Sequence, residues 1–481
     1  MSEASNLPEV GTATAPPPRD DPRHVLRERR GFVARGAYEV AGRTGARVGL
    51  AWVGIMVLAA VFAPFLANSH PFLWKHQGQI TSPWLEHLTP TDVALLLAFV
   101  SGVVAAALWR VPAGWRFALW VLLMALVLPG LYRAGFADRI DTIMQVPPQQ
   151  RHGLVPIYVQ LSAGLLVCLI AIIGVLWRSA AGWPWKLGVV VLAVGLNVLF
   201  LIQPIVPPKT VIYQQYREAA AAGEIDWVVY APVPYSPKDR QYDVLQATGK
   251  DPRRLQPEPG HWMGTTTKGA DVLSRMIYAS RIALTIGLIA TGIAATIGII
   301  VGGVMGYFSR AVDLFGMRCV EIFSAIPVIF LLIMIVAFWG RSLYLMTVVL
   351  GLTGWVGYAL YVRAEFLKIR SMDYVQAARA AGVPLWSILF RHMLPNGITP
   401  VLVLASFGIA SMILTESTLS FIGLGLTDDP SWGQMLNEAR EAVDQWGLII
   451  FPGLAIFLTV FAYNLIGEAM RDALDPHMAG K

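Results

Sequence analysis

Residues 282–307 read IALTIGLIATGIAATIGIIVGGVMGY, a stretch without a single charged side chain. About 20 mostly apolar residues in a helix are enough to cross the hydrocarbon core of a bilayer, so this stretch predicts a membrane-spanning helix. The whole chain agrees with it, because 56% of its 481 residues are hydrophobic and only 14% are charged, whereas soluble domains are about 25% charged. The composition excludes an ordinary soluble enzyme and predicts an integral membrane protein.

Further runs of similar length predict ten spanning helices, and therefore an all-α membrane fold. They lie at 46–67, 92–110, 116–133, 154–177, 186–204, 282–307, 317–338, 344–362, 398–421 and 447–469. Most basic connections fall on the same side as the arginine-rich segment 23–47, which the positive-inside rule assigns to the cytoplasm. Both ends of the chain are therefore expected in the cytoplasm. The connection at 133–151 departs from the rule, because it would lie outside and carries three arginines.

Polar segments divide the chain into parts. Residues 1–45 begin rich in proline, alanine and threonine and become basic, which predicts a disordered cytoplasmic arm rather than a signal peptide. Residues 205–280 are polar and contain PVPYSP at 232–237, which favours extended backbone in an extracytoplasmic lobe. The short polar end, 471–481, is expected to be a cytoplasmic tail.

One cytoplasmic segment, between the eighth and ninth predicted spans, reads YVRAEFLKIRSMDYVQAARAAGVPLWSILFRHMLPNGITP over 361–400. Its alanine-rich part, 374–381, favours a helix, which Gly382 ends. Pro384 can stand in the first turn of a second helix. Two helices that meet at a glycine predict a protruding knob; an amphipathic surface loop is the alternative.

The sequence QAARAAG, followed nine residues later by HMLP, resembles the EAA loop in the membrane subunits of ATP-binding cassette (ABC) importers. In that family the loop seats in a groove of the ATPase subunit. Gln376 stands here in place of the family's glutamate, and His392 in place of the general isoleucine. The peptide branch of the family tends to read R-H-x-L-P-N, as 391–396 do. The resemblance implies that ATPase coupling involves Tyr374, Gln376, Ala377, Ala378, Arg379, Gly382, Arg391, His392, Leu394 and Pro395.

The segment HWMGTTTKGADVLSRMIYASRIALTIGL at 261–288 is similar to the corresponding part of oligopeptide and dipeptide permease C-type subunits. The wording of 361–383 and of GEAMRDALDP at 467–476 most resembles the microcin-C-like subgroup of that branch. The resemblance covers roughly 260–476 and the first span, 46–67. Such subunits usually have six spans, so the four predicted helices within 92–204 are expected to be an insertion. The resemblance implies that 281–470 form a type I importer permease core, whose coupling loop lies at 363–397. The insertion could be a peripheral packing bundle or a docking site for another subunit or lipid.

The resemblance also implies a function and partners. It implies the permease subunit of an ATP-driven importer for peptide-like solutes, in a bacterial cytoplasmic membrane. A second permease subunit, cytoplasmic ATPases and an extracytoplasmic solute-binding protein would be its partners, with no role for nucleic acid. An ion-coupled secondary transporter is the alternative, but the two related halves expected of many such transporters are not evident.

No catalytic motif accompanies these features. The sequence GTTTKG around Gly264 lacks the spacing of a phosphate-binding P-loop. No cofactor is therefore expected on this chain, and ATP would be hydrolysed by a partner subunit. His70, His76 and His87 lack metal-ligand spacing. Two carboxylates fall within predicted spans, where charge is costly. Glu321 is expected to pair with Arg318, and Glu416 either lines a substrate path or accepts structural hydrogen bonds.

Overall fold

The computed structural model describes residues 40–76, 78–107, 120, 124, 213–241, 251–308, 310–426 and 429–474. The predicted spans at 154–177 and 186–204 lie outside the described residues, as does the span at 116–133 except for Trp120 and Met124. The N-terminal arm up to residue 39 and the tail from residue 475 also lie outside them.

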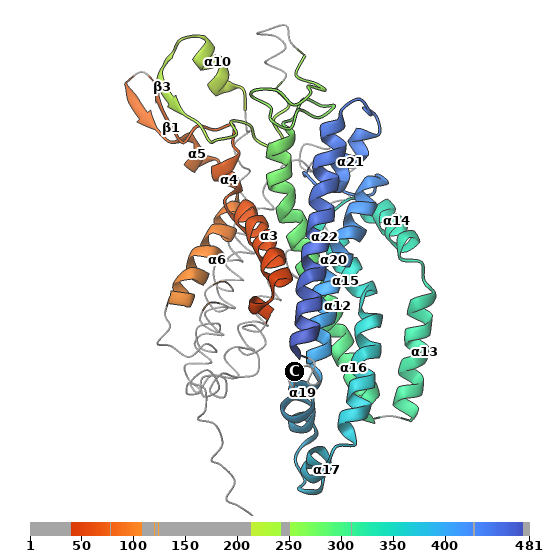
Figure 1. Ribbon diagram of the computed structural model, residues 1–481. Helices are drawn as coiled ribbons and strands as arrows, with labels where there is room; N and C mark the ends of the chain where they lie inside the picture. Colours follow the sequence, from red (N-terminus) through yellow and green to blue (C-terminus); the bar gives the residue numbers. More distant parts are fainter. Residues whose placement is uncertain are drawn as a thin grey trace, which may run out of the picture.

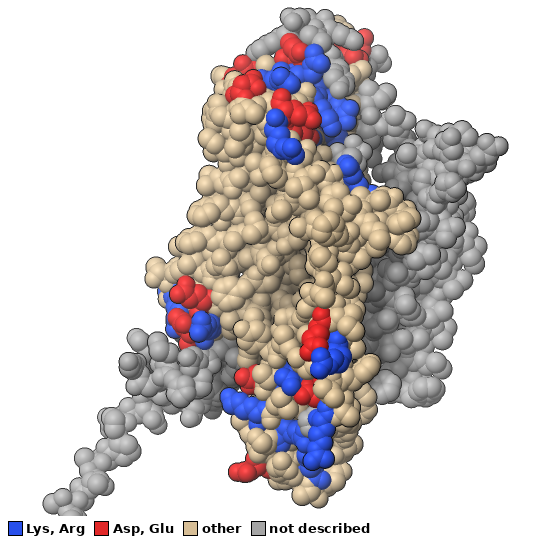
Figure 2. Space-filling view, turned by 90° about the vertical axis from the view of Figure 1, so that its right-hand side faces the viewer, with Lys and Arg blue, Asp and Glu red and all other residues tan. Residues whose placement is uncertain are grey.

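A bundle of long apolar helices forms the body of the molecule (Figure 1). In the described part of the chain, five helical spans are long and apolar enough to cross a membrane. They are α3 (Thr44–Val61), α12 (Val272–Phe308), α15 with α16 (Leu343–Thr353 and Trp355–Arg370), α20 (Thr399–Phe421) and α22 (Trp446–Leu474). Figure 2 shows charged side chains at the two ends of the visible face and a broad band almost free of them between. The predicted all-α membrane fold is confirmed.

Helix α12 is the centre of the bundle and packs closely against α16. A β-carbon on Gly298 would lie 2.3 Å from the Cβ of Tyr358, and one on Gly302 would lie 2.3 Å from the carbonyl oxygen of Ala359. Gly306, one turn further on, has the same close relation to Phe366. Small residues at four-residue spacing let two helices in a membrane approach until their backbones touch. The two helices therefore form one closely packed pair.

A sixth span is broken. Helices α13 (Ala311–Ala325) and α14 (Val328–Trp339) meet at a 71° bend, so the prediction of one continuous helix over 317–338 is wrong. Pro327 has no N–H to donate and disfavours helical backbone in the residue before it. Ile326 is accordingly extended, with φ −83° and ψ 117°. Helix α14 is thinly packed, since Leu332 is its one buried side chain.

A polar lobe covers one end of the bundle (Figure 1). It contains a three-stranded antiparallel sheet in the order β2-β1-β3, from Gln79–Thr81, Leu73–His76 and Ile225–Val229. The short helices α4 (Ala63–Leu66), α5 (Pro83–Glu86) and α10 (Gln215–Ala221) accompany it. The predicted lobe at 205–280 is therefore completed by residues that precede the insertion, a pairing that local sequence patterns do not reveal.

Buried polar groups hold the lobe together. Asp239, whose side chain is 4% exposed, accepts hydrogen bonds from the Ser69 hydroxyl at 2.6 Å and from the Arg217 guanidinium at 2.6 Å. His70 and His87 stack with ring centroids 4.1 Å apart. Burial, together with the neighbouring His87, lowers the pKa of His70 to about 4. The imidazole of His70 is therefore neutral at pH 7, as its buried position requires.

The start of the segment 92–204, which the sequence predicts to be an insertion, is fixed to the helical bundle at the lobe end. Thr89 caps helix α6 (Pro90–Ala107), because its hydroxyl accepts a hydrogen bond from the N–H of Asp92 in the first turn. The carboxylate of Asp92 in turn accepts a 2.6 Å hydrogen bond from Arg281 of α12. The side chains of Asp92 and Arg281 are 4% and 11% exposed. Arg281 also donates to the carbonyl oxygen of Ala60, next to the end of α3. The Arg281 side chain of α12 thus joins the start of α6 to α3.

Candidate functional site: the helical knob

The segment singled out by its sequence forms a knob at the opposite end from the lobe (Figure 1). We call residues 371–397 the knob. It consists of α17 (Asp373–Ala380), α18 (Leu385–Ser387), the π-helix η2 (Ile388–Met393) and α19 (Leu394–Gly397). The predicted pair of helices meeting at a glycine is confirmed.

Gly382 makes the turn between the two helical parts. Its φ is +71°, a left-handed value that glycine adopts without the steric cost of a β-carbon. The N–H of Gly382 donates to the carbonyl of Arg379, and the N–H of Val383 donates to that of Ala378, both at 3.1 Å. These two bonds define a Schellman motif, which satisfies the free carbonyls at a helix end. A β-carbon on Gly382 would meet no atom within 4 Å, so the turn faces open space.

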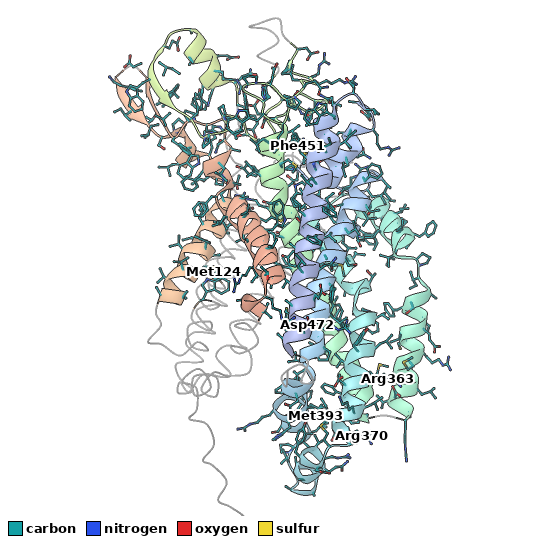
Figure 3. All side chains as sticks on the ribbon, viewed as in Figure 1. Met124, Arg363, Arg370, Met393, Phe451 and Asp472 are labelled. Carbon is teal, nitrogen blue, oxygen red and sulfur yellow. The ribbon has the colours of Figure 1, made fainter. Side chains whose placement is uncertain are left out.

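Apolar side chains anchor the knob to the bundle. Val375 and Met393 are fully buried and pack with Phe366 and Ile369 of α16. Met393 lies close to the end of α16 that Arg370 marks in Figure 3. Because Phe366 also packs against Gly306 of α12, a displacement of the knob has a continuous packed route into the bundle.

The outer surface of the knob carries an aromatic pair that the sequence interpretation missed. The rings of Trp386 and Phe390 stack with centroids 5.5 Å apart, and the side chains are 70% and 52% exposed. Arg391 is exposed next to them in sequence, and Figure 2 shows basic side chains gathered at this end. Residues four apart lie on one face of a helix, so the spacing of Trp386 and Phe390 could have predicted the pair from the sequence.

The other predicted coupling residues are distributed over this surface. Tyr374, Gln376, Ala377, Arg379 and Pro395 are exposed, whereas Ala378, His392 and Leu394 are half-buried. The amide of Gln376 donates to the carbonyl oxygen of Arg370 at 3.2 Å, which helps to cap the end of α16. An ionised glutamate could not donate this bond, so the glutamine that departs from the family pattern has a structural use here.

Glu416 lies away from the knob, near the lobe end of α20. Its side chain is 2% exposed and accepts hydrogen bonds from Ser420 at 2.7 Å and from Ser431 at 2.9 Å. Ser431 is also the N-cap of α21 (Trp432–Ala439). The side chain of Glu416 therefore joins α20 to α21, as the structural alternative describes.

The structure also shows the surroundings of other charged side chains and of possible metal ligands. Arg318 and Glu321 form the expected pair. Within the described residues no cluster of three or more histidine, cysteine, aspartate or glutamate side chains could hold a metal ion. Asp429, in the loop after α20, pairs with Lys238 at 2.9 Å, and this contact connects that loop to the lobe.

The protein is a bundle of membrane-spanning helices with a polar lobe at one end and the knob, which turns at Gly382, at the other. This architecture is that of the membrane subunit of a transporter. Residues 296–480 match the family described as "Binding-protein-dependent transport system inner membrane component", and the chain belongs to this family. It is thus the permease component of an ABC importer, as the sequence motifs predicted.

Relatives with assigned names support the same conclusion. The glutathione transport system permease protein GsiD of Pectobacterium atrosepticum is 36% identical over 239 residues, which cover 49% of this chain and 79% of the relative. The inner membrane ABC transporter permease protein YejE of Escherichia coli is 36% identical over 256 residues, covering 53% and 73%. The oligopeptide transport system permease protein OppC of Salmonella typhimurium is 41% identical over 221 residues, covering 45% and 72%.

Proposed function

We propose that this chain imports peptides or peptide-like solutes together with a second permease subunit, and that its knob receives the motion of a cytoplasmic ATPase. The names of the relatives favour this substrate class, since glutathione, dipeptides and oligopeptides share amide-linked residues. An extracytoplasmic solute-binding protein would deliver the solute at the lobe end. The knob would then lie in the cytoplasm, and both ends of the chain with it.

The observation that carries the coupling role is the construction of the knob. Its outer face presents Trp386 and Phe390 to solvent, where exposed aromatics are unfavourable unless a partner covers them. Its inner face is locked to α16 by Val375 and Met393. A partner that grips the outer face therefore moves α16, and α12 follows through the close glycine contacts.

Gly382 offers the test that separates docking from folding. Gly382→Asn keeps the turn, because asparagine tolerates left-handed backbone, but adds a side chain to the space that the partner would occupy. Gly223→Asn is the matched control, since Gly223 has φ +73°, no atom within 4 Å of a β-carbon, and a place in the lobe. The measurement is peptide uptake by the full complex in proteoliposomes.

We expect Gly382→Asn to lower ATP-driven uptake by about tenfold or more, the loss of a central interface contact, with normal membrane insertion. Gly223→Asn should transport like the wild type. Wild-type uptake by Gly382→Asn would contradict the proposed coupling role. Uptake that continues without ATP in the presence of an ion gradient would instead support a secondary transporter.

A further inference from the structure

One side of the broken span α13–α14 is uncovered along its whole length. The side chains of Phe315, Ile322, Phe330 and Phe338 are 73%, 64%, 70% and 76% exposed, and we call these four residues the outer face of the span. This side of the molecule faces the viewer in Figure 2, and charged side chains are sparse there between the two ends. Apolar side chains alone assign no partner to a membrane helix, because lipid tails are as apolar as leucine.

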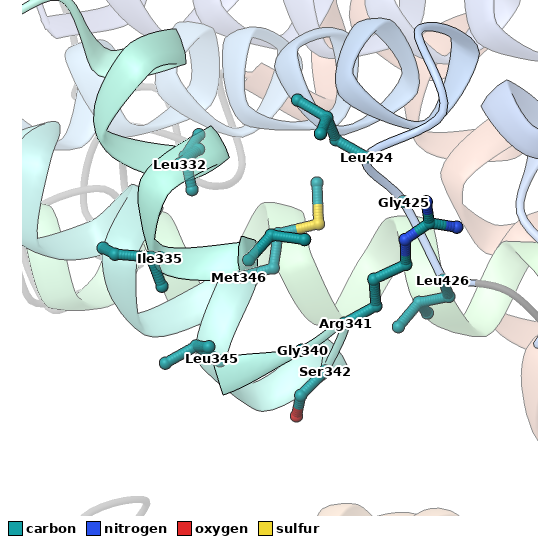
Figure 4. Close-up of a pocket in the computed structure, with 11 residues that line it drawn as sticks. Leu332, Ile335, Gly340, Arg341, Ser342, Leu345, Met346, Leu424, Gly425 and Leu426 are labelled. Carbon is teal, nitrogen blue, oxygen red and sulfur yellow. The ribbon is translucent and has the colours of Figure 1, made fainter. Parts of the chain in front are cut away.

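The opposite side of both helices is packed against the bundle. Leu332 and Ile335 of α14 face Met346 of α15 across the small hollow drawn in Figure 4. In α13, Val320 packs in one cluster with Met305 of α12. The outer face therefore points away from the rest of the described chain.

The break between the two helices lies at the depth of the hydrocarbon core. The ring of Phe323, near the end of α13, contacts the ring of Trp355 with centroids 5.3 Å apart, and Trp355 is near the middle of the span Leu343–Arg370. The 15 residues of α13 extend over about 22 Å at 1.5 Å per residue, which is less than the roughly 30 Å of a hydrocarbon core. Residues 324–327 thus lie within the membrane rather than at its surface.

Backbone groups at this break have no partner in the described part of the chain. The carbonyl oxygens of Ser324, Ala325 and Ile326 accept no hydrogen bond from the described residues, and Pro327, the N-cap of α14, offers no side-chain cap. Every residue from 321 to 327 is exposed. Non-helical backbone at membrane depth is tolerated where protein or a water-filled cavity covers it, but not against lipid, which cannot hydrogen-bond it. Lipid is therefore excluded as the cover of the break.

An ion pair beside the outer face leads to the same conclusion. Arg318 and Glu321 pair with each other while their side chains remain 66% and 51% exposed. Arg318 follows Phe315 by three residues and precedes Ile322 by four, so these three side chains share one side of α13. Charged side chains within a membrane span almost always face protein or water, because hydrocarbon does not solvate them.

The apolar side chains distinguish protein from water as the cover. Three exposed phenylalanines would line a water-filled path at high cost, whereas the cores of stable protein interfaces are apolar and rich in aromatic residues. We propose that the second permease subunit packs on the outer face of α13–α14, with hydroxyl or amide donors that bind the free carbonyls at the break. This inference rests on the proposed function, which requires such a subunit, and it adds the surface and the chemistry of the contact.

The test is photo-crosslinking in the complete complex in phosphatidylcholine vesicles. The photoreactive analogue p-benzoylphenylalanine replaces Phe315 in one variant and Phe330 in another, so that two positions on different helices probe the face. Phe457, which is 62% exposed on α22, is replaced in the control variant. Radiolabelled trialanine is present with ATP during illumination, and its uptake shows that each complex is assembled.

We expect both test variants to form a covalent adduct with the second permease subunit, and the Phe457 variant to form none with it. Adducts with lipid alone at both test positions overturn the proposed interface. Radiolabel attached to this chain would place the solute path at the face and also overturn it. So would an adduct between two copies of this chain, or an equal yield of the second-subunit adduct from the Phe457 variant.

The interface and the proposed function fail in different ways. A complex that takes up trialanine with ATP but yields lipid adducts alone remains a peptide importer and loses the proposed interface. A preparation in which no second permease subunit co-purifies, and in which uptake does not need ATP, overturns the proposed function and the interface with it.

Discussion

The knob and the lobe stand at opposite ends of one bundle and are stabilised by different interactions. The knob is fixed by buried apolar side chains such as Val375 and Met393. The lobe and the adjoining start of the insertion are fixed by buried polar pairs such as Asp239 with Arg217 and Asp92 with Arg281. Close apolar packing makes a segment rigid, but the attraction between apolar side chains has no preferred direction. A buried ion pair, in contrast, is favourable only when its two charged groups are correctly placed. The contrast fits the proposal that the knob receives the motion of an ATPase, and it fits a lobe in which segments far apart in the sequence are joined.

The largest effect on stability is expected at the lobe end. Asp92→Asn leaves Arg281 buried without its counter-charge, which should cost about 3 kcal/mol. Thermal unfolding of the purified protein measures the loss. Asp251→Asn is the control, because Asp251 forms an exposed pair with Arg253 that contributes little. If the two variants have equal melting temperatures, the buried pair does not anchor the insertion.

A smaller effect is expected in the knob. Met393→Ala removes a fully buried side chain and should destabilise the knob by about 2 kcal/mol. Hydrogen exchange in α17 should become faster, while exchange in β1 and β3 should stay the same. The exposed Met372, on the same segment, gives the control Met372→Ala. Faster exchange throughout the protein would show that knob and lobe are not independent units.

The core and the knob could be predicted because their signals are local. Long uncharged runs define the spans, and an alanine-rich segment that ends at Gly382 defines α17 and its turn. The bend at Pro327 was missed although proline marks it, because the apolar run continues through the break. A sheet that pairs β1 with β3 across the whole insertion has no local signal.

The roles of Gln376 and Glu416 show the limits of motif comparison. A family pattern marks Gln376 as a departure from glutamate, but only the fold reveals the hydrogen bond that its amide donates to Arg370. The sequence leaves Glu416 open between lining a substrate path and accepting structural hydrogen bonds, and only the fold reveals the three serine hydroxyls that donate to it.

The proposed coupling requires the ATPase to dock on the aromatic face of the knob. The most direct measurement is the affinity of the ATPase subunits for the membrane complex in nanodiscs, with Trp386→Ala compared with Trp262→Ala. These tryptophans are similarly exposed, at 70% and 67%, but lie at opposite ends of the molecule. We predict that Trp386→Ala weakens binding by about tenfold or more, as loss of an interface anchor does, and that Trp262→Ala has no effect. Equal affinities for the two variants would contradict the account.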